Sequence, residues 1–171
     1  MSEVIQNQAE EKKAKHPKYH PVRMQKIPAH LEGAAALEKL CFSNPWSAKS
    51  MELLTNEGIG VGYLCTAPAA PNAEAMVTAY GGMLITVDEG QITNIAVHPD
   101  HRRKGLGAAI LRTLLRHAKD AKLESVSLEV RVSNTAAIKL YESFGFEQVG
   151  KRPRFYEKPT EDAYVMVCKI K

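Results

Sequence analysis

The sequence predicts one α/β domain whose mixed sheet is mostly antiparallel, with a single parallel pair and helices on both faces. Strand-like segments separated by turns fill residues 58–97, which is typical of an antiparallel meander. A long amphipathic helix then separates the strand at 91–97 from an alternating strand at 125–132, and such a unit favours a parallel pair with a right-handed crossover. The chain of 171 residues suits one domain over residues 21–171, after a polar tail at 1–20 that is expected to be flexible.

The first elements after the tail are predicted to be an edge strand and two helices. Val22–Ile27 has strand character and is followed by Pro28. Ala29–Leu40 is predicted as a helix because apolar residues recur at helical spacing, namely Leu31, Ala34, Ala35, Leu37 and Leu40. Ser47 is suited to cap a second, short helix that runs to Thr55.

The meander is predicted to contain three strands, at Gly58–Thr66, Ala75–Asp88 and Gln91–Val97. The segment Thr66–Glu74 is rich in alanine and proline and is expected to form a loop. Gly81-Gly82 interrupts the middle strand and indicates a bulge. Asp88-Glu89-Gly90 supplies the turn into the last of the three strands.

The second half of the chain is predicted to alternate helices and strands. The helix that begins near Leu106 buries one stripe, consisting of Leu106, Ile110, Leu111, Leu114, Leu115 and Ala118. Ser125–Val132 alternates between apolar and polar residues, as a strand with one buried face does. Ser133 or Asn134 is suited to cap a helix at Thr135–Phe144, which Gly145 ends. Two final strands are expected at Phe146–Lys151 and Ala163–Ile170, joined by a loop around Pro153–Asp162.

The segment between the strand at 91–97 and the following helix predicts an anion site. It reads Arg102-Arg103-Lys104-Gly105-Leu106-Gly107-Ala108. The first amides of a helix lack internal partners and favour negative charge, and glycine allows a ligand to approach the backbone closely. The sequence contains neither Gly-x-x-x-x-Gly-Lys-Ser/Thr nor Gly-x-Gly-x-x-Gly, so a nucleotide-hydrolysing P-loop and a dinucleotide fold are not supported. The alternative is an ordinary charged turn.

The pattern Arg102-x-x-Gly105-x-Gly107 resembles the acyl-CoA signature of the GNAT family of N-acetyltransferases, Arg/Gln-x-x-Gly-x-Gly/Ala. The order of elements resembles that family over nearly the whole chain. This resemblance implies the GNAT fold, with its parallel pair at a splayed sheet centre, and acetyl-CoA as the acetyl donor. The cofactor-binding residues that it implies are Ile95, Ala96, Val97, Arg102, Arg103, Lys104, Gly105, Leu106, Gly107, Ala108 and Asn134.

Main-chain groups at Ile95–Val97 are suited to pair with the amides of the pantetheine arm, as a peptide adds to an exposed sheet edge. One amide there is also suited to stabilise an oxyanion. Asn134 has two equal interpretations, as a contact to the cofactor or as the cap of its helix.

Within the family, the chain resembles the ribosomal-protein-alanine N-acetyltransferases, which acetylate an N-terminal alanine of a small-subunit ribosomal protein. Four segments carry this likeness: Phe42–Ser47, Leu128–Asn134, Ala136–Phe146 and Glu161–Ala163. The chain departs from the subfamily in its N-terminal tail, in the loop Ala67–Glu74 and at Arg154-Phe155-Tyr156, where the subfamily tends to carry paired tyrosines. These departures bear on the acceptor and leave the acetyl donor unaffected.

The resemblance implies that Glu129 is the general base and Tyr141 the general acid. A carboxylate is sufficient to deprotonate an N-terminal amine, whose reference pKa is about 7.7–8.0. A phenol stays protonated near neutral pH and is able to donate a proton to a leaving thiolate. The alternatives are a surface carboxylate or a partner of Arg131 for Glu129, and a core aromatic for Tyr141. Trp46 and Tyr156 are expected to line the peptide entrance or to pack at its rim.

Composition is consistent with this function. The net charge of +4 fits an anionic ligand such as coenzyme A and is too weak to indicate nucleic-acid binding. The three cysteines have no metal-ligand spacing, so no metal is expected, and they are interpreted as inert thiols. No signal peptide or membrane segment is evident, and a cytoplasmic, plausibly monomeric protein is expected. Alternative functions are acetylation of a small amine or lysine side chain, and a non-catalytic acyl-CoA sensor.

Overall fold

The computed structural model describes residues 19–67 and 75–170, which form a sheet of seven strands in the order β1-β2-β3-β4-β5-β7-β6. The strands are β1 (Val22–Arg23), β2 (Gly60–Ala67), β3 (Met76–Ile85), β4 (Glu89–Val97), β5 (Ser125–Arg131), β6 (Glu147–Glu157) and β7 (Thr160–Lys169). The helices are α2 (Pro28–Cys41), α3 (Ala48–Met51), α4 (Leu106–Asp120) and α5 (Thr135–Ser143), and short 3₁₀ helices lie at η1 (Glu52–Thr55) and η2 (Pro99–His101).

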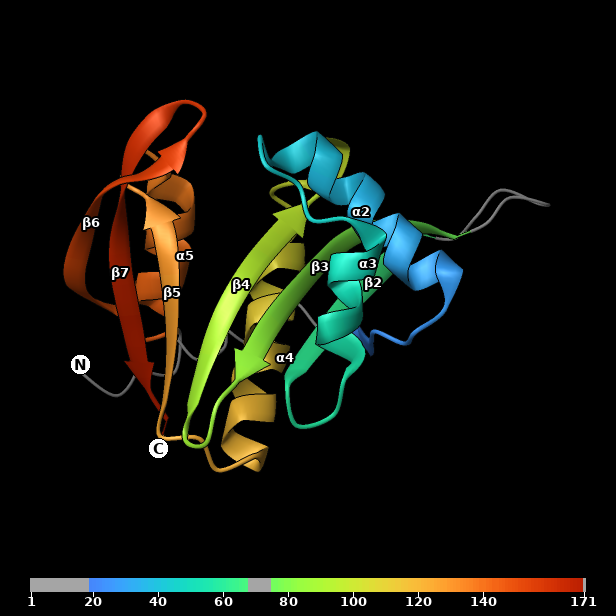
Figure 1. Ribbon diagram of the computed structural model, residues 1–171, viewed down its shortest axis with the longest axis horizontal. Coiled ribbons are helices and arrows are strands. Elements are labelled where there is room, and N and C mark those ends of the chain that lie inside the picture. Colours follow the sequence, from blue (N-terminus) through green and yellow to red (C-terminus); the bar gives the residue numbers. More distant parts are fainter. Residues whose placement is uncertain (1–18, 68–74, 171) are drawn as a thin grey trace, which may run out of the picture.

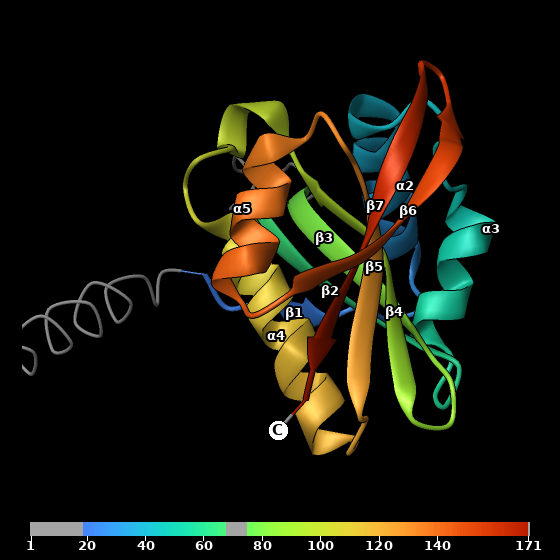
Figure 2. The same cartoon turned by 90° about the vertical axis from the view of Figure 1, so that its left-hand side faces the viewer.

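Helices cover both faces of the sheet, as predicted. Figure 2 shows α4 and α5 on one face and α2 and α3 on the other. One apolar cluster fills the α4 side and includes Ile110, Leu114 and Leu128. A second cluster lies under α2 and includes Leu37, Leu54 and Tyr80. Burial of apolar side chains on both faces is what fixes the strands between the two helical layers.

The predicted parallel pair is confirmed, and it is short. β4 and β5 are parallel and pair only from Glu89–Gln91 to Ser125–Ser127. Every other pair of neighbouring strands in the described sheet is antiparallel. Beyond the short pair, β4 and β5 diverge, which Figure 1 shows as two strands that separate toward their C-terminal ends.

The second half of the chain follows its sequence pattern closely. In α4 the residues Leu106, Ile110, Leu111, Leu114 and Ala118 are buried, and Leu115 packs partly against them. Asn134 caps α5, because its side chain accepts a hydrogen bond from the amide of Ala137. β5 alternates between buried and half-buried positions. Gly145 ends the helix with φ of 86°, a conformation that glycine adopts at little cost.

The N-terminal elements differ from the prediction in two respects. The edge strand is only Val22–Arg23 instead of Val22–Ile27, and Pro28 begins α2, where its missing amide would have no helical partner. The helix predicted at Ala29–Leu40 is confirmed, but the last apolar residue of its repeat does not face the core. Leu40 is 57% exposed, whereas Glu38 is fully buried. Glu38 lies seven residues after Leu31, on the same helix face, and therefore points at the sheet.

The C-terminal prediction is wrong around Pro153–Asp162. Most of this segment is not a loop, because β6 continues to Glu157 and β7 begins at Thr160, with Tyr156 and Glu157 paired to Glu161 and Thr160. A register shift between Arg152 and Tyr156 absorbs the extra residues as a bulge. The bulge associated with Gly81-Gly82 places its extra residue in β4, at Thr93. The predicted tail lies almost entirely outside the described residues, as does most of the loop Thr66–Glu74.

The close approach of β3 to α4 gives a test of the packing. A Cβ atom at Gly81 would lie 2.4 Å from the Cγ2 of the buried Ile110. We expect Gly81→Ala to lower the free energy of unfolding by about 1–3 kcal/mol, because the core must shift to relieve this overlap. Urea denaturation measures the effect. Gly150→Ala is the matched control, since its nearest neighbour would be Val165 at 3.9 Å, an ordinary contact. Equal stability of Gly81→Ala and the wild type would contradict the packing described.

Candidate active site

The site is built around the divergence of β4 and β5. After Gln91, β4 remains paired with β3 while β5 remains paired with β7. The bulge at Thr93 bends β4 at this point, and the Thr93 hydroxyl donates to the carbonyl of Gly82 at 3.2 Å. One edge of β4 is therefore free of a strand partner from Ile92 to Val97 within the described sheet.

The register decides which main-chain groups of β4 face this free edge. The amide of His98 donates to the carbonyl of Thr78, so these two form a hydrogen-bonded pair. Antiparallel pairs alternate, which directs the backbone groups of Ala96 toward β3 and those of Ile95 and Val97 toward the free edge. The carbonyl of Val97 already accepts from Arg102 Nε at 3.2 Å and from the Cys41 thiol at 3.6 Å. The amides of Ile95 and Val97 and the carbonyl of Ile95 remain available to bind a ligand.

The basic segment after β4 forms a tight turn. Arg103 has φ of 62° and Gly105, the residue before α4, has φ of 87°. Arg102 is anchored to Val97, and Lys104 Nζ donates to the carbonyl of Asp100 at 2.9 Å. A Cβ atom at Gly105 would have nothing within 4 Å, so a ligand is able to approach the backbone there.

The first turn of α4 completes the predicted anion site. Leu106 is buried and contributes its amide alone, whereas Gly107 and Ala108 are half-buried. A Cβ atom at Gly107 would lie 3.6 Å from Leu140 and 3.7 Å from Val97. Because α4 is long and starts at these residues, its unpaired amides and dipole favour an anion. The side chains of Arg102, Arg103 and Lys104 are exposed around them.

Glu129 lies on β5 with its side chain 12% exposed. Its Oε1 is 3.3 Å from the guanidinium of Arg152, and its Oε2 accepts from Gln91 Nε2 at 3.3 Å. Arg131 is not its partner, because Arg131 pairs with Glu161 at 3.0 Å. Glu129 is thus oriented by β4 on one side and by β6 on the other.

Tyr141 approaches from α5, on the opposite face of the sheet. Tyr141 is 9% exposed, and the centroid of its ring lies 5.8 Å from the centroid of the Phe146 ring. Burial, with a smaller contribution from Tyr156, raises the pKa of the Tyr141 phenol, so the hydroxyl keeps its proton at neutral pH. The packing interpretation of Tyr141 is confirmed, and it is compatible with proton donation.

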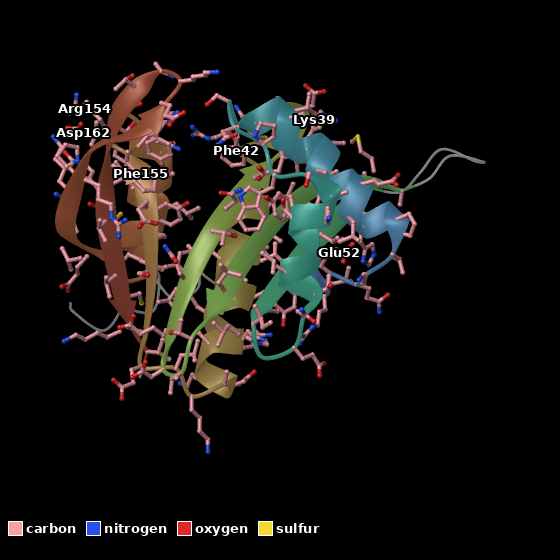
Figure 3. All side chains as sticks on the ribbon, viewed as in Figure 1. Lys39, Phe42, Glu52, Arg154, Phe155 and Asp162 are labelled. Carbon is pink, nitrogen blue, oxygen red and sulfur yellow. The ribbon has the colours of Figure 1, made fainter. Side chains whose placement is uncertain are left out.

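Aromatic residues flank the divergence of β4 and β5. Trp46 lies in the segment between α2 and α3 and packs against the cluster under α2. Tyr156 lies on β6, where its hydroxyl donates to the carbonyl of Glu129 at 3.4 Å and the guanidinium carbon of Arg131 lies 4.1 Å from its ring centroid. Phe42 and Phe155 are partly exposed, and Figure 3 places them on the α2 side and the β6 side of the divergence.

Comparison with known proteins identifies the family. The model of the Acetyltransferase (GNAT) family matches residues 31–146. The chain belongs to this family. It is 36% identical over 144 residues to the ribosomal protein bS18-alanine N-acetyltransferase of Escherichia coli strain K12, covering 82% of this chain and 91% of that protein.

Solved structures agree with this assignment. The ribosomal-protein-S18-alanine N-acetyltransferase from Escherichia coli superposes with a TM-score of 0.74 at 31% identity, covering 89% of this chain and 95% of that one. Arabidopsis thaliana NAA60 in complex with acetyl-CoA has the same fold, with a TM-score of 0.74 at 18% identity over 89% of this chain and 97% of that one. The protein is therefore an acetyl-CoA-dependent N-acetyltransferase with the GNAT fold.

Two of the three cysteine thiols, those of Cys65 and Cys168, are buried. Burial raises the pKa of the Cys65 thiol to about 11 and also raises that of Cys168, which makes both poor nucleophiles near neutral pH. Within residues 19–67 and 75–170, no cluster of three or more histidine, cysteine or acidic side chains is arranged to hold a metal ion. No helix in the same ranges is both long and apolar enough to cross a bilayer.

Sequence reasoning missed one group of polar residues beside the site. The buried carboxylate of Glu38 accepts hydrogen bonds from the Tyr80 hydroxyl, from Asn94 Nδ2 at 2.8 Å and from the amide of Trp46 at 2.8 Å. One signal was available in the sequence: residues 31, 34, 35 and 38 form an i, i+3, i+4, i+7 stripe, and the last of them is a glutamate.

Gly105 gives a test of the anion site. We expect Gly105→Ala to weaken acetyl-CoA binding, because a left-handed conformation costs a residue with a Cβ about 1–2 kcal/mol and relaxing it would move the turn. Gly58→Ala is the matched control. Gly58 has φ of 81° and equally open surroundings, but lies in the turn before β2. Calorimetric titration with acetyl-CoA measures the affinity. Weaker binding in both variants, or in neither, would contradict a specific role for this turn.

Proposed function

We propose that this enzyme transfers the acetyl group of acetyl-CoA to the N-terminal α-amine of a protein, with an alanine of a ribosomal protein as the favoured acceptor. The observation that carries the proposal is the position of Glu129. Its carboxylate lies at the divergence of β4 and β5, between Gln91 and Arg152, while Tyr141 lies on α5, on the other face of the sheet. The name of the Escherichia coli relative gives the acceptor class.

The acetyl donor is expected to bind along β4 and at the start of α4. The free amides of Ile95 and Val97 would pair with the pantetheine arm, as a strand pairs with an exposed edge. The amides from Gly105 to Ala108 would hold the pyrophosphate, with Arg102, Arg103 and Lys104 contributing positive charge around it. Ala96 would contribute little through its backbone, since its groups face β3. Asn134 would act chiefly as the cap of α5.

The reaction needs one proton acceptor and one proton donor. The neutral amine attacks the thioester carbonyl, a C–N bond forms and the C–S bond breaks. Glu129 receives the proton that the amine loses, directly or through a water, and Tyr141 gives a proton to the departing thiolate. The amide of Ile95 or Val97 would stabilise the charge on the carbonyl oxygen.

The base favours an α-amine over a lysine side chain. The reference pKa of an N-terminal amine is about 7.7–8.0, against about 10.4 for lysine, so much less driving force is needed to deprotonate the former. Trp46 and Tyr156 would line the path of the acceptor peptide toward Glu129. A ribosomal acceptor would place this reaction in the cytoplasm.

A peptide panel tests the acceptor. The enzyme is incubated with acetyl-CoA and with peptides that have free alanine, serine or methionine N-termini, N-blocked peptides that contain lysine, and spermidine. Mass spectrometry is expected to show acetyl groups on free N-termini, with alanine preferred. Label on lysine or spermidine alone would contradict the proposed acceptor and leave the acetyl donor intact. Binding of acetyl-CoA without any product would favour a non-catalytic sensor.

Substitution of the base tests the mechanism. We expect Glu129→Gln to lower kcat by roughly 10²–10⁴-fold, because the amide cannot accept the proton of the amine. Acetyl-CoA affinity should stay within about twofold, since Glu129 is not among the proposed donor-binding residues. Steady-state kinetics and titration measure the two quantities. Glu124→Gln, at an exposed position directly before β5, is the control. An unchanged kcat in Glu129→Gln would remove this residue from the mechanism.

A further inference from the structure

Glu38 is an ionisable residue in the interior of the protein. It lies on α2, is fully buried, and forms no ion pair with a lysine or arginine among the described residues. Its two oxygens are satisfied by three donors, of which Tyr80 and Asn94 share Oε1 while the amide of Trp46 takes Oε2. Burial raises the pKa of this carboxyl, and the hydrogen bonds oppose the increase.

Stability alone does not account for this arrangement. Removing a carboxylate from water is costly, and an apolar side chain of similar volume usually fills such a position at least as well. Residues of the same helix, Ala34 and Leu37, belong to the apolar cluster under α2 together with Tyr80, which is itself a donor to Glu38. A buried polar group of this kind fixes one geometry, because each donor loses its partner when the elements shift.

The three donors come from three elements that must be held together at the site. Tyr80 is on β3 and Asn94 is on β4, directly before Ile95, whose backbone faces the free edge. Trp46 lies in the segment that links α2 to α3, and its amide bonds to the carboxylate across eight residues. Glu38 thus ties the segment carrying Trp46 to the strand that carries the proposed donor-binding amides.

We propose that Glu38 is a positioning residue of the acceptor site, which sets the place of Trp46 relative to β4 and thereby the affinity for the acceptor peptide. This inference rests on the proposed function. Glu38 is not a second base, because its carboxylate is fully buried and out of reach of an incoming amine. Its effect passes through the amide of Trp46, so it acts on the acceptor and leaves the binding of the acetyl donor unchanged.

Steady-state kinetics of Glu38→Gln test the inference. The substitution keeps the size of the side chain and replaces one acceptor oxygen with a donor, so that at least one of the three donors loses its partner. We expect KM for an alanine-ended peptide to rise roughly tenfold, with kcat and KM for acetyl-CoA within about twofold. Glu32→Gln is the matched control, because Glu32 is exposed on the same helix. An unchanged peptide KM, or an equal rise in both KM values, would overturn the inference.

A double-mutant cycle with Trp46→Ala tests whether Glu38 acts through Trp46. If Glu38 acts through Trp46, the peptide KM of the double variant equals that of Trp46→Ala alone. Independent, multiplicative effects would overturn the proposal. Asn94→Ala replaces Glu38→Gln in both experiments if the latter fails to fold, as judged by thermal unfolding. It removes one of the three donors, and the same KM pattern with a smaller change is expected.

The activity of the wild-type enzyme distinguishes a failure of the proposed function from a failure of the inference about Glu38. If it acetylates no peptide N-terminus, the proposed function fails and this inference fails with it. If it acetylates the peptide and Glu129→Gln loses activity while folded Glu38→Gln keeps a normal peptide KM, only the inference about Glu38 fails.

Discussion

The separation of β4 from β5 is the constraint on which the rest of the site depends. A sheet that stayed paired along its whole length would satisfy every backbone group of β4 and leave none for a ligand. The bulge at Thr93 bends β4 after three residue pairs with β5, and beyond it β3 is the only strand partner of β4 among the described residues. The start of α4 lies just beyond the end of the same strand, so the free edge leads directly into the unpaired amides of the helix.

The proposed base and acid lie on opposite faces of the sheet. Strand alternation places Leu128 and Val130 against the α4 side and Glu129 on the other side. Tyr141 belongs to the α4 side. In a continuous sheet a carboxylate and a phenol so placed would be divided by the backbone. That division is absent where β5 has lost its neighbour, and there Arg152 and Tyr156 of β6 contact Glu129.

Some residues of the segments that flank this region depart from the usual structural preferences. Arg103 and Arg154 have positive φ without being glycine, and Glu38 is a buried carboxylate without a cation in the described structure. Glu38 and Arg154 are held by specific contacts. For Arg154 the contact is the bond from its amide to Asp162 Oδ1 at 2.9 Å, inside the bulge of β6. Such departures cost stability, and their concentration at a functional site is a common pattern in proteins.

The sequence by itself determined the fold class, the parallel pair, the basic turn before α4 and the alternation of β5. These features depend on local periodicity, glycine placement and helix capping, which neighbouring residues decide. Only the tertiary structure decided that Glu38 is buried while Leu40 is exposed, that β6 extends to Glu157, and that Arg152 rather than Arg131 pairs with Glu129. Those outcomes depend on which elements meet across the sheet, because a partner distant in the chain supplies the hydrogen bonds and charges that offset the local preference.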